Sequence, residues 1–208
     1  MNEKDIVNAK KPELIIFAGP NGSGKSTITD VLRPSYATYI NQDEIKKFLH
    51  CSDMEALQIS LKQKNEQLEK RNDFCFETVL SSHYNVDFIQ KCREAEYFVR
   101  CYYIITVDPL INVTRVKLRV ESGGHDVPVN KIISRYDKSL DNIRKVLPLC
   151  DVCHIYDNSY TIEEGKPHRV FKKRKEKYFY HENNDWHIED IQALTGITDI
   201  QQKDLNMY

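Results

Sequence analysis

The sequence predicts an α/β fold with three layers, in which helices cover both faces of a central, mostly parallel, five-stranded sheet. Two observations predict it. The apolar run 14–18 leads directly into a glycine-rich turn, and a helix-like segment begins at Lys25. Further along, apolar runs of strand length alternate with segments of helix length, which is typical of βαβ units with right-handed crossovers. Ligands of such sheets bind beyond the carboxyl ends of the strands, so candidate site residues should follow strands.

Apolar periodicity and helix-breaking residues place the elements. Pro34 ends the first helix, and Pro109 suits the first turn of a later one. The last long helix has apolar residues at three-and-four spacing, so one of its faces should be core. The expected strands are 14–19, 36–41, 74–80, 99–107 and 152–157; the expected helices are 25–33, 42–49, 54–70, 84–95, 109–121 and a long one after Pro128 to about 147.

The whole chain, 1–208, is expected to form one domain, because its 208 residues suffice for a substantial core. Within it we expect a helical lid at about 109–147. A small C-terminal hairpin with a short helix is expected at about 166–195. The 54–70 helix is polar, and its apolar side chains should lie near one side; these are Met54, Leu57, Leu61 and Leu68.

The composition indicates the cellular compartment in which we expect the protein. The apolar content is 40%, the charged content is 29% and the formal charge is −1, which gives no general attraction to nucleic acid or anionic membranes. No apolar run approaches the roughly 20 residues that span a bilayer, and the polar start lacks a signal-peptide core. We therefore expect a cytoplasmic protein with reduced, buried cysteines. Cys150 and Cys153 form a lone C-x-x-C pair, for which a metal or redox role is the alternative.

The glycine-rich turn fits the pattern G-x-x-x-x-G-K-S/T between a strand and a helix, which predicts a P-loop NTPase or kinase fold that binds ATP with Mg²⁺. Its glycines let backbone N–H groups point at phosphate oxygens, and the helix dipole adds positive charge. Lys25 should reach the β- and γ-phosphates, and Ser26 should bind Mg²⁺. A plain strand-to-helix turn is the alternative. The expected nucleotide-binding residues here are Gly19, Pro20, Asn21, Gly22, Ser23, Gly24, Lys25, Ser26 and Thr27.

Three carboxylates follow strands. Asp43 is a candidate general base for an attacking hydroxyl, although Asn41-Gln42-Asp43-Glu44 also reads as a helix start. Glu77, which ends a strand with Thr78, is hard to bury without a partner, and this favours a role in holding Mg²⁺-bound water or a substrate hydroxyl. An outward-facing edge position is the alternative. Asp108 resembles a metal-coordinating acid, but we favour a turn residue before Pro109.

Arginines flank a glycine break at Gly123-Gly124, and two helices joined in this way suggest a movable lid over the phosphates. Arg115 and Arg119 share one helix face, and Arg135 lies on the next helix. They could neutralise the transferring phosphoryl group, although surface arginines are the simpler interpretation. His125 is more typical of a lid turn than of a catalytic base.

The segment 169–177 is basic and interleaved with aromatic residues. Such interleaving could indicate nucleic-acid contact. We favour the solvated face of a hairpin whose lysines protect a sheet edge, so a nucleic-acid partner is not expected.

Taken together, these residues resemble the zeta toxin family of P-loop kinases from the phosphate loop to Ser159. The resemblance is carried by the phosphate loop and by Ile-Asn-Gln-Asp-Glu-Ile, Phe-Glu-Thr-Val-Leu-Ser, Arg-Val-Glu-Ser-Gly-Gly-His-Asp-Val-Pro, Ser-Arg-Tyr-Asp-Lys-Ser-Leu and Tyr-Asp-Asn-Ser, in that order. The Gly-Gly-His-Asp-Val-Pro segment marks a short, compact branch. Family members phosphorylate the 3′-hydroxyl of UDP-N-acetylglucosamine and are restrained by a small antitoxin, so the resemblance implies an ATP-dependent kinase with a hydroxyl acceptor and an antitoxin partner.

The resemblance also implies roles for individual residues. Asp43 would be the general base, and Lys25 with Arg115, Arg119 and Arg135 would bind the triphosphate. Glu77 and Thr78 would face the acceptor substrate. Asp157 and Asn158 would lie near the adenine.

Two rival classes share the phosphate loop. An ABC-type ATPase also needs a Leu-Ser-Gly-Gly-Gln-like segment and an Asp-Glu pair after an apolar strand, and the sequence contains neither. A nucleotide switch or nucleic-acid-binding ATPase without kinase activity is the second alternative, and it rests only on the basic hairpin.

Overall fold

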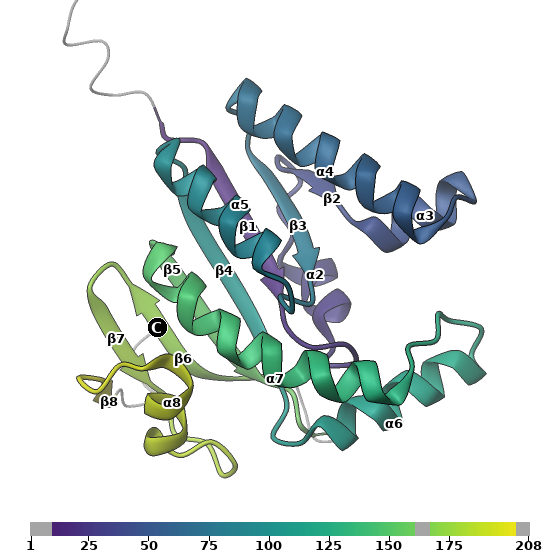
Figure 1. The fold of residues 1–208 in the computed structure, drawn as a ribbon. Coiled ribbons are helices and arrows are strands. Elements are labelled where there is room, and N and C mark those ends of the chain that lie inside the picture. The colour runs from purple at the N-terminus through teal and green to yellow at the C-terminus, as the bar shows by residue number, and fades with distance from the viewer. Residues whose placement is uncertain (1–9, 161–166, 203–208) are drawn as a thin grey trace, which may run out of the picture.

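The computed structural model describes residues 10–160 and 167–202. In these ranges the protein consists of one β-sheet with helices packed against it (Figure 1). The strands are β1 (Glu13–Ala18), β2 (Thr38–Ile40), β3 (Phe74–Thr78), β4 (Phe98–Ile105), β5 (Val152–Asp157), β6 (His168–Arg174), β7 (Lys177–Tyr180) and β8 (Gln201–Gln202). The helices are α2 (Lys25–Leu32), α3 (Gln42–Leu49), α4 (Asp53–Lys70), α5 (His83–Glu94), α6 (Pro109–Glu121), α7 (Val129–Val146) and α8 (Ile188–Thr195).

The sheet has eight strands in the described residues, in the order β2-β3-β1-β4-β5-β6-β7-β8. The first five are parallel, as expected. The expected total of five was wrong, because the C-terminal hairpin extends the same sheet. Its strand β6 pairs antiparallel with β5, with Phe171 opposite Ile155, and β8 adds a parallel edge to β7.

Alternate residues of β1 face two different cores. Leu14 and Ile16 belong to the larger core, which α5, α7 and α8 cover on one face of the sheet (Figure 1). Ile15 and Phe17 point to the other face, where α2 contributes Ile28. All six residues of β1 are buried, which suits a central parallel strand covered on both faces.

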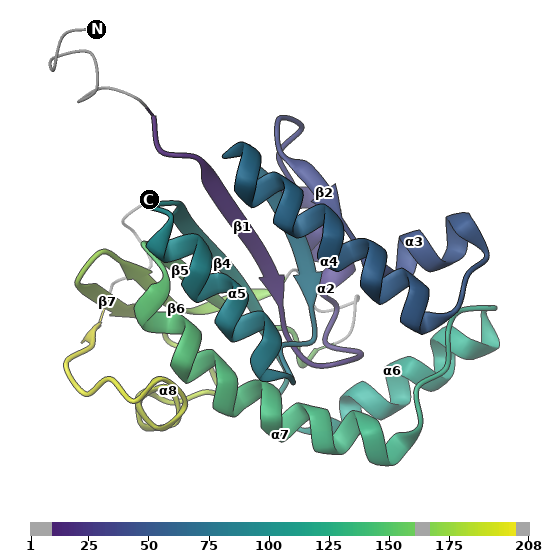
Figure 2. The same ribbon diagram turned by 45° about the horizontal axis from the view of Figure 1, so that its top comes forward.

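Helix α7 is shared between the main core and the lid region. Its second half packs into the main core, where Ile143 and Val146 are fully buried. Its first half packs against α6 through a separate small cluster of Val113, Val116 and Ile132. Helix α6 and the first half of α7 therefore form a unit beyond the carboxyl ends of the strands (Figure 2).

Two expectations about surfaces need correction. In α4, Met54 and Leu57 are exposed, and the buried positions are Ala56, Ser60 and Lys64. In the basic hairpin, Lys173 is buried and donates hydrogen bonds to the carbonyls of Leu147 and Pro148 at 2.9 and 3.3 Å. The other basic residues of the turn, including Arg174, Lys175 and Lys177, are exposed. None of the helices in the described ranges is long and apolar enough to cross a membrane.

The main core should dominate stability. Phe74 is fully buried and packs edge-on against Phe88 and Tyr97. We expect Phe74→Ala to lower the free energy of unfolding by about 3–5 kcal/mol, the cost of a large cavity. The control Phe48→Ala removes a ring that is 82% exposed and should change it by less than about 0.5 kcal/mol. Urea denaturation of both variants measures this, and equal effects would contradict the assigned core.

Candidate active site

The phosphate loop follows β1 and can be built only from glycine at three positions. Gly19, Gly22 and Gly24 have φ angles of +145°, +78° and +92°. A Cβ atom would lie 2.1 Å from the Ile104 carbonyl oxygen at Gly19 and 2.5 Å from the Asn112 carbonyl oxygen at Gly22. These contacts exclude any side chain, because they are made to backbone that cannot move aside. The loop is therefore fixed by β4 and α6 together.

The loop also carries the features of a phosphate site. Helix α2 begins at Lys25, and its N-cap residue Gly24 supplies no side-chain cap, so the first N–H groups of the helix remain available to a ligand. The buried Ser23 hydroxyl and the buried Asn112 amide nitrogen have no hydrogen-bond partner among the described residues. Buried donors normally have partners, so these two atoms indicate a missing polar ligand. The loop thus fits the phosphates of a nucleotide.

Lys25 occupies the centre of the site. Its Nζ donates a hydrogen bond of 2.9 Å to the Pro20 carbonyl. Burial lowers the pKa of Lys25 to about 8, while the carboxylates of Glu77 and Asp43 oppose this shift and the Arg119 charge adds to it. These electrostatic effects require that all three groups lie near the Lys25 ammonium. The structure therefore brings Asp43, Glu77 and Arg119 together around the phosphate loop.

Glu77 ends β3 directly beside the loop serine. Its carboxylate accepts hydrogen bonds from Ser26 Oγ at 3.1 Å and from Tyr39 OH at 2.7 Å. Asn41 Nδ2 in turn donates to Tyr39 OH at 2.7 Å. Burial raises the pKa of the Tyr39 phenol, so Tyr39 stays protonated and donates to Glu77. Sequence reasoning missed Tyr39, four residues before the candidate base Asp43, and it identified Asn41 only as part of a helix start and not as a partner of Tyr39.

The Ser26–Glu77 pair fits Mg²⁺. Mg²⁺ takes oxygen ligands and is usually bound by one or two carboxylates together with substrate phosphates. A serine hydroxyl and a carboxylate oxygen 3.1 Å apart at the mouth of a phosphate loop provide such oxygens. No group of three His, Cys, Asp or Glu residues within 10–160 and 167–202 could hold a metal by itself. A metal at this place would depend on the nucleotide phosphates.

Asp43 is exposed in the first turn of α3, but it is not the helix cap. Asn41 Oδ1 caps the helix by accepting from the backbone N–H groups of Asp43 and Glu44 at 2.8 and 3.3 Å. The helix-start interpretation therefore applies to Asn41. Across the described residues the Asp43 carboxylate takes part in no hydrogen bond or ion pair, which leaves it available to a substrate hydroxyl.

Two of the three arginines of the predicted lid, Arg115 and Arg119, hold loops in this structure. Arg115 donates to the carbonyls of Asn158 and Tyr160 at 2.6 and 2.8 Å, so it clamps the segment after β5. Arg119 donates to the His125 carbonyl at 2.6 Å, with Gly124 packed on its stem. Arg135 is half-buried and makes no hydrogen bond or ion pair with any described residue. Of the three, Arg135 alone has a guanidinium free for a ligand.

The turn between α6 and α7 faces the corner between α3 and α4. Lys46 lowers the pKa of Asp53 at that corner, and the nearby charges of His125 and Lys131 lower it further. The turn between α6 and α7 therefore lies near the corner between α3 and α4 (Figure 2). Asp108 caps α6 by accepting from the Leu110 N–H at 2.7 Å, as the turn interpretation predicted.

The remaining candidates have partners within the protein. The buried Thr78 hydroxyl accepts from the Leu80 N–H at 2.9 Å and from Asn85 Nδ2 at 3.0 Å. The buried Asp157 carboxylate accepts from Ser159 and Asn183. Asn158 donates to the Ser23 carbonyl at 2.8 Å, which closes the phosphate loop against the segment after β5.

Comparisons with known proteins agree with this geometry. A solved chain of the AvrRxo1-ORF1:AvrRxo1-ORF2 complex with sulphate ions is similar at a TM-score of 0.69 and 16% identity; the match covers 91% of this chain and 65% of that one. A chain from the PezAT chromosomal toxin–antitoxin system of Streptococcus pneumoniae is similar at a TM-score of 0.55 and 16% identity, covering 76% and 75%. An uncharacterized protein of Haemophilus influenzae is 27% identical over 127 residues, 59% of this chain and 91% of the relative.

The structural matches show a shared fold, and this chain spans 65% of the length of the AvrRxo1 chain that it matches. The family model for the zeta toxin matches residues 1–185, which include every element of the site described above. Membership of that family supports a kinase-type function for the phosphate loop. The chain belongs to the zeta toxin family.

Proposed function

We propose that this protein is a kinase that transfers the γ-phosphoryl group of ATP–Mg²⁺ to a hydroxyl group of a small molecule. The observation that carries the proposal is the meeting of three groups around one phosphate loop: Lys25, the Ser26–Glu77 pair and the free carboxylate of Asp43.

Each group has a distinct task in the transfer. Lys25 holds the β- and γ-phosphates and offsets their charge, which is most of what catalysis of phosphoryl transfer requires. The Ser26 hydroxyl and the Glu77 carboxylate would hold Mg²⁺, which would supply positive charge to the nucleotide phosphates. Tyr39 and Asn41 keep the Glu77 carboxylate in place by hydrogen bonding.

Asp43 is the proposed general base. Its carboxylate stands on the first turn of α3, at the carboxyl edge of the sheet, and accepts the proton of the attacking hydroxyl. Arg135 is the proposed guanidinium for the transferring phosphoryl group, because Arg115 and Arg119 are engaged with loop carbonyls. Closure of the α6–α7 unit toward α3 would bring Arg135 over the phosphates.

The acceptor and the partner follow from the family. Because the chain resembles toxins that phosphorylate a nucleotide-sugar, we propose an acceptor of that class, such as UDP-N-acetylglucosamine. The AvrRxo1 structure is a complex of two proteins and the PezAT structure comes from a toxin–antitoxin system, which supports the proposal of an antitoxin-like partner. We also propose that the protein acts in the cytoplasm. Incubation with ATP and a panel of nucleotide-sugars, nucleosides and RNA ends tests the acceptor class.

Removal of the Lys25 charge should weaken nucleotide binding while the fold stays intact. We expect Lys25→Ala to weaken ATP–Mg²⁺ binding by about 10- to 100-fold, the loss of a charge-assisted hydrogen bond. The control Lys91→Ala removes an exposed lysine on α5 and should leave the affinity unchanged. Calorimetric titration of both variants measures this. Equal affinities for wild type and Lys25→Ala would remove the phosphate loop from nucleotide binding.

Asp43→Asn should keep ATP affinity while phosphoryl transfer falls by about 10²–10⁴-fold, because an amide cannot take the hydroxyl proton. The neighbouring Glu44→Gln changes an exposed carboxylate in the same helix turn and should retain activity. Glu77→Gln should instead raise the Mg²⁺ concentration needed for half-maximal activity. Transfer assays with an identified acceptor across a Mg²⁺ series distinguish the three, and near-normal transfer by Asp43→Asn would exclude it as the base.

A further inference from the structure

Helix α4 buries a lysine among aromatic rings, close to the candidate site. Lys64 is only 6% exposed, and its Nζ lies 4.3 Å from the ring centre of Phe76 and 5.7 Å from that of Phe88. Its one hydrogen bond, of 3.1 Å, goes to Asn85 Oδ1, and no carboxylate among the described residues pairs with it. Burial lowers the pKa of Lys64 to about 8. Burial of an ammonium group without a carboxylate partner costs free energy, so the presence of a lysine at this position requires an explanation.

That hydrogen bond is the first link of a chain that fixes the turn after Glu77. Asn85 Nδ2 donates to Thr78 Oγ1 at 3.0 Å, and the Leu80 N–H donates to the same oxygen at 2.9 Å. Leu80 is fully buried and has a φ of +58°. A non-glycine residue rarely adopts this left-handed conformation, and contacts from its surroundings must offset the cost. The hydrogen bond from the Leu80 N–H to the Thr78 hydroxyl is one such contact.

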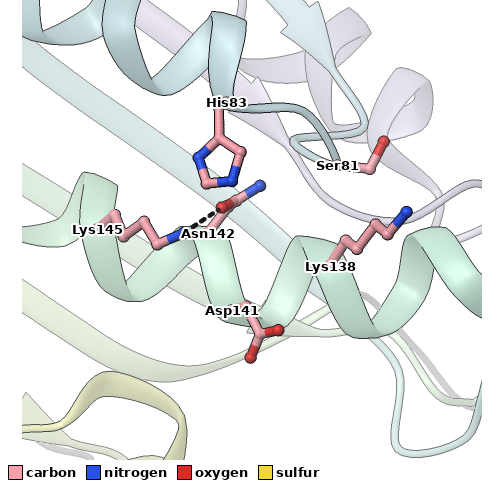
Figure 3. Close-up of a pocket in the computed structure, with 6 residues that line it drawn as sticks. All are labelled: Ser81, His83, Lys138, Asp141, Asn142 and Lys145. Carbon is pink, nitrogen blue, oxygen red and sulfur yellow. Dashed lines mark hydrogen bonds between the residues drawn. The ribbon is translucent and has the colours of Figure 1, made fainter.

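The chain continues into the lid helix. The Leu80 carbonyl accepts from Asn142 Nδ2 of α7 at 2.9 Å, and Lys145 Nζ donates to Asn142 Oδ1 at 3.1 Å. Figure 3 shows this last bond beside a hollow that Ser81 and His83 line from the α5 side and four α7 residues line from the other. One chain of hydrogen bonds therefore joins α4, the turn after Glu77 and α7.

Stability alone does not explain a lysine at position 64. A methionine would bury the same methylene groups without a charge, and the replacement of buried ionic groups by apolar ones is often neutral or stabilising. A methionine cannot orient Asn85, however. What the ammonium adds is a fixed direction for the Asn85 amide, and through it a fixed turn at Leu80, three residues beyond Glu77.

We propose that Lys64 is a positioning residue of the kinase site, which acts through Asn85 and Thr78 to hold the turn after Glu77 in register with α7. The inference rests on the proposed function, because the group that it positions is the Glu77 carboxylate that holds Mg²⁺. Lys64 does not touch the phosphate loop, so its effect falls on turnover and not on nucleotide affinity.

The test compares Lys64→Met, Thr78→Val and the double variant, with Lys62→Met as control for an exposed lysine on the same helix. With ATP and Mg²⁺ alone, we expect Lys64→Met to lower kcat by about tenfold or more through misplacement of the site. KM for ATP, calorimetric ATP affinity and the free energy of unfolding should stay near wild type. Thr78→Val should give a similar loss, and the double variant no more than the larger single loss, because both act through one chain.

Hydrogen exchange tests the position of the turn independently of activity. Lys64→Met should lose protection at 78–82 while β1 and β4 keep theirs. Unchanged kcat with unchanged protection would overturn the proposal, and so would a kcat loss matched by equal losses of stability and ATP affinity. If the wild-type protein turns over no ATP, the kinase function fails, and exchange at 78–82 alone then decides whether Lys64 positions the turn.

Discussion

The site depends on backbone packed directly against backbone at the phosphate loop. Gly19 lies so close to the Ile104 carbonyl, and Gly22 to Asn112, that the loop exists only because β4 and the start of α6 meet there without intervening side chains. Asn158 holds the third side through the Ser23 carbonyl. Three segments that are distant in sequence therefore set the direction of the loop N–H groups and the position of Lys25. Any element that shifts one of these segments shifts the nucleotide site.

Charge balance around Lys25 follows from that packing. Burial lowers the pKa of Lys25, and the charges of Glu77 and Asp43 only partly offset this shift, so the pKa is about 8. Triphosphate oxygens add negative charge next to the ammonium, and a nearby opposite charge favours the charged form. Nucleotide binding therefore completes the electrostatics of the site as well as its hydrogen bonds. The two unpartnered donors at Ser23 and Asn112 indicate the same incompleteness.

Local patterns predicted most of the fold and the centre of the site. The five parallel strands, the phosphate loop and the helix starts at Pro109 and Asn41 each have a signal within a few residues, because glycine, proline and capping chemistry is local. The pairing of β6 with β5 was missed, because the register that places Phe171 opposite Ile155 joins segments distant in sequence and has no such local signal. Tyr39 was missed for the same reason, since its partner Glu77 is 38 residues away. The buried positions of α4 were not predicted, because Ala56, Ser60 and Lys64 do not form an apolar stripe.

The proposed kinase function requires transfer of a phosphoryl group to an acceptor. The most direct measurement follows the γ-phosphate of labelled ATP in the presence of candidate hydroxyl acceptors. The account predicts that label moves from ATP to one acceptor class at a rate well above its release as inorganic phosphate. It also predicts that this product disappears when Asp43 is changed to Asn, while ATP remains bound. Label that appears only as inorganic phosphate, at a rate that no nucleotide-sugar, nucleoside or RNA end alters, would contradict a kinase and favour a nucleotide-hydrolysing switch.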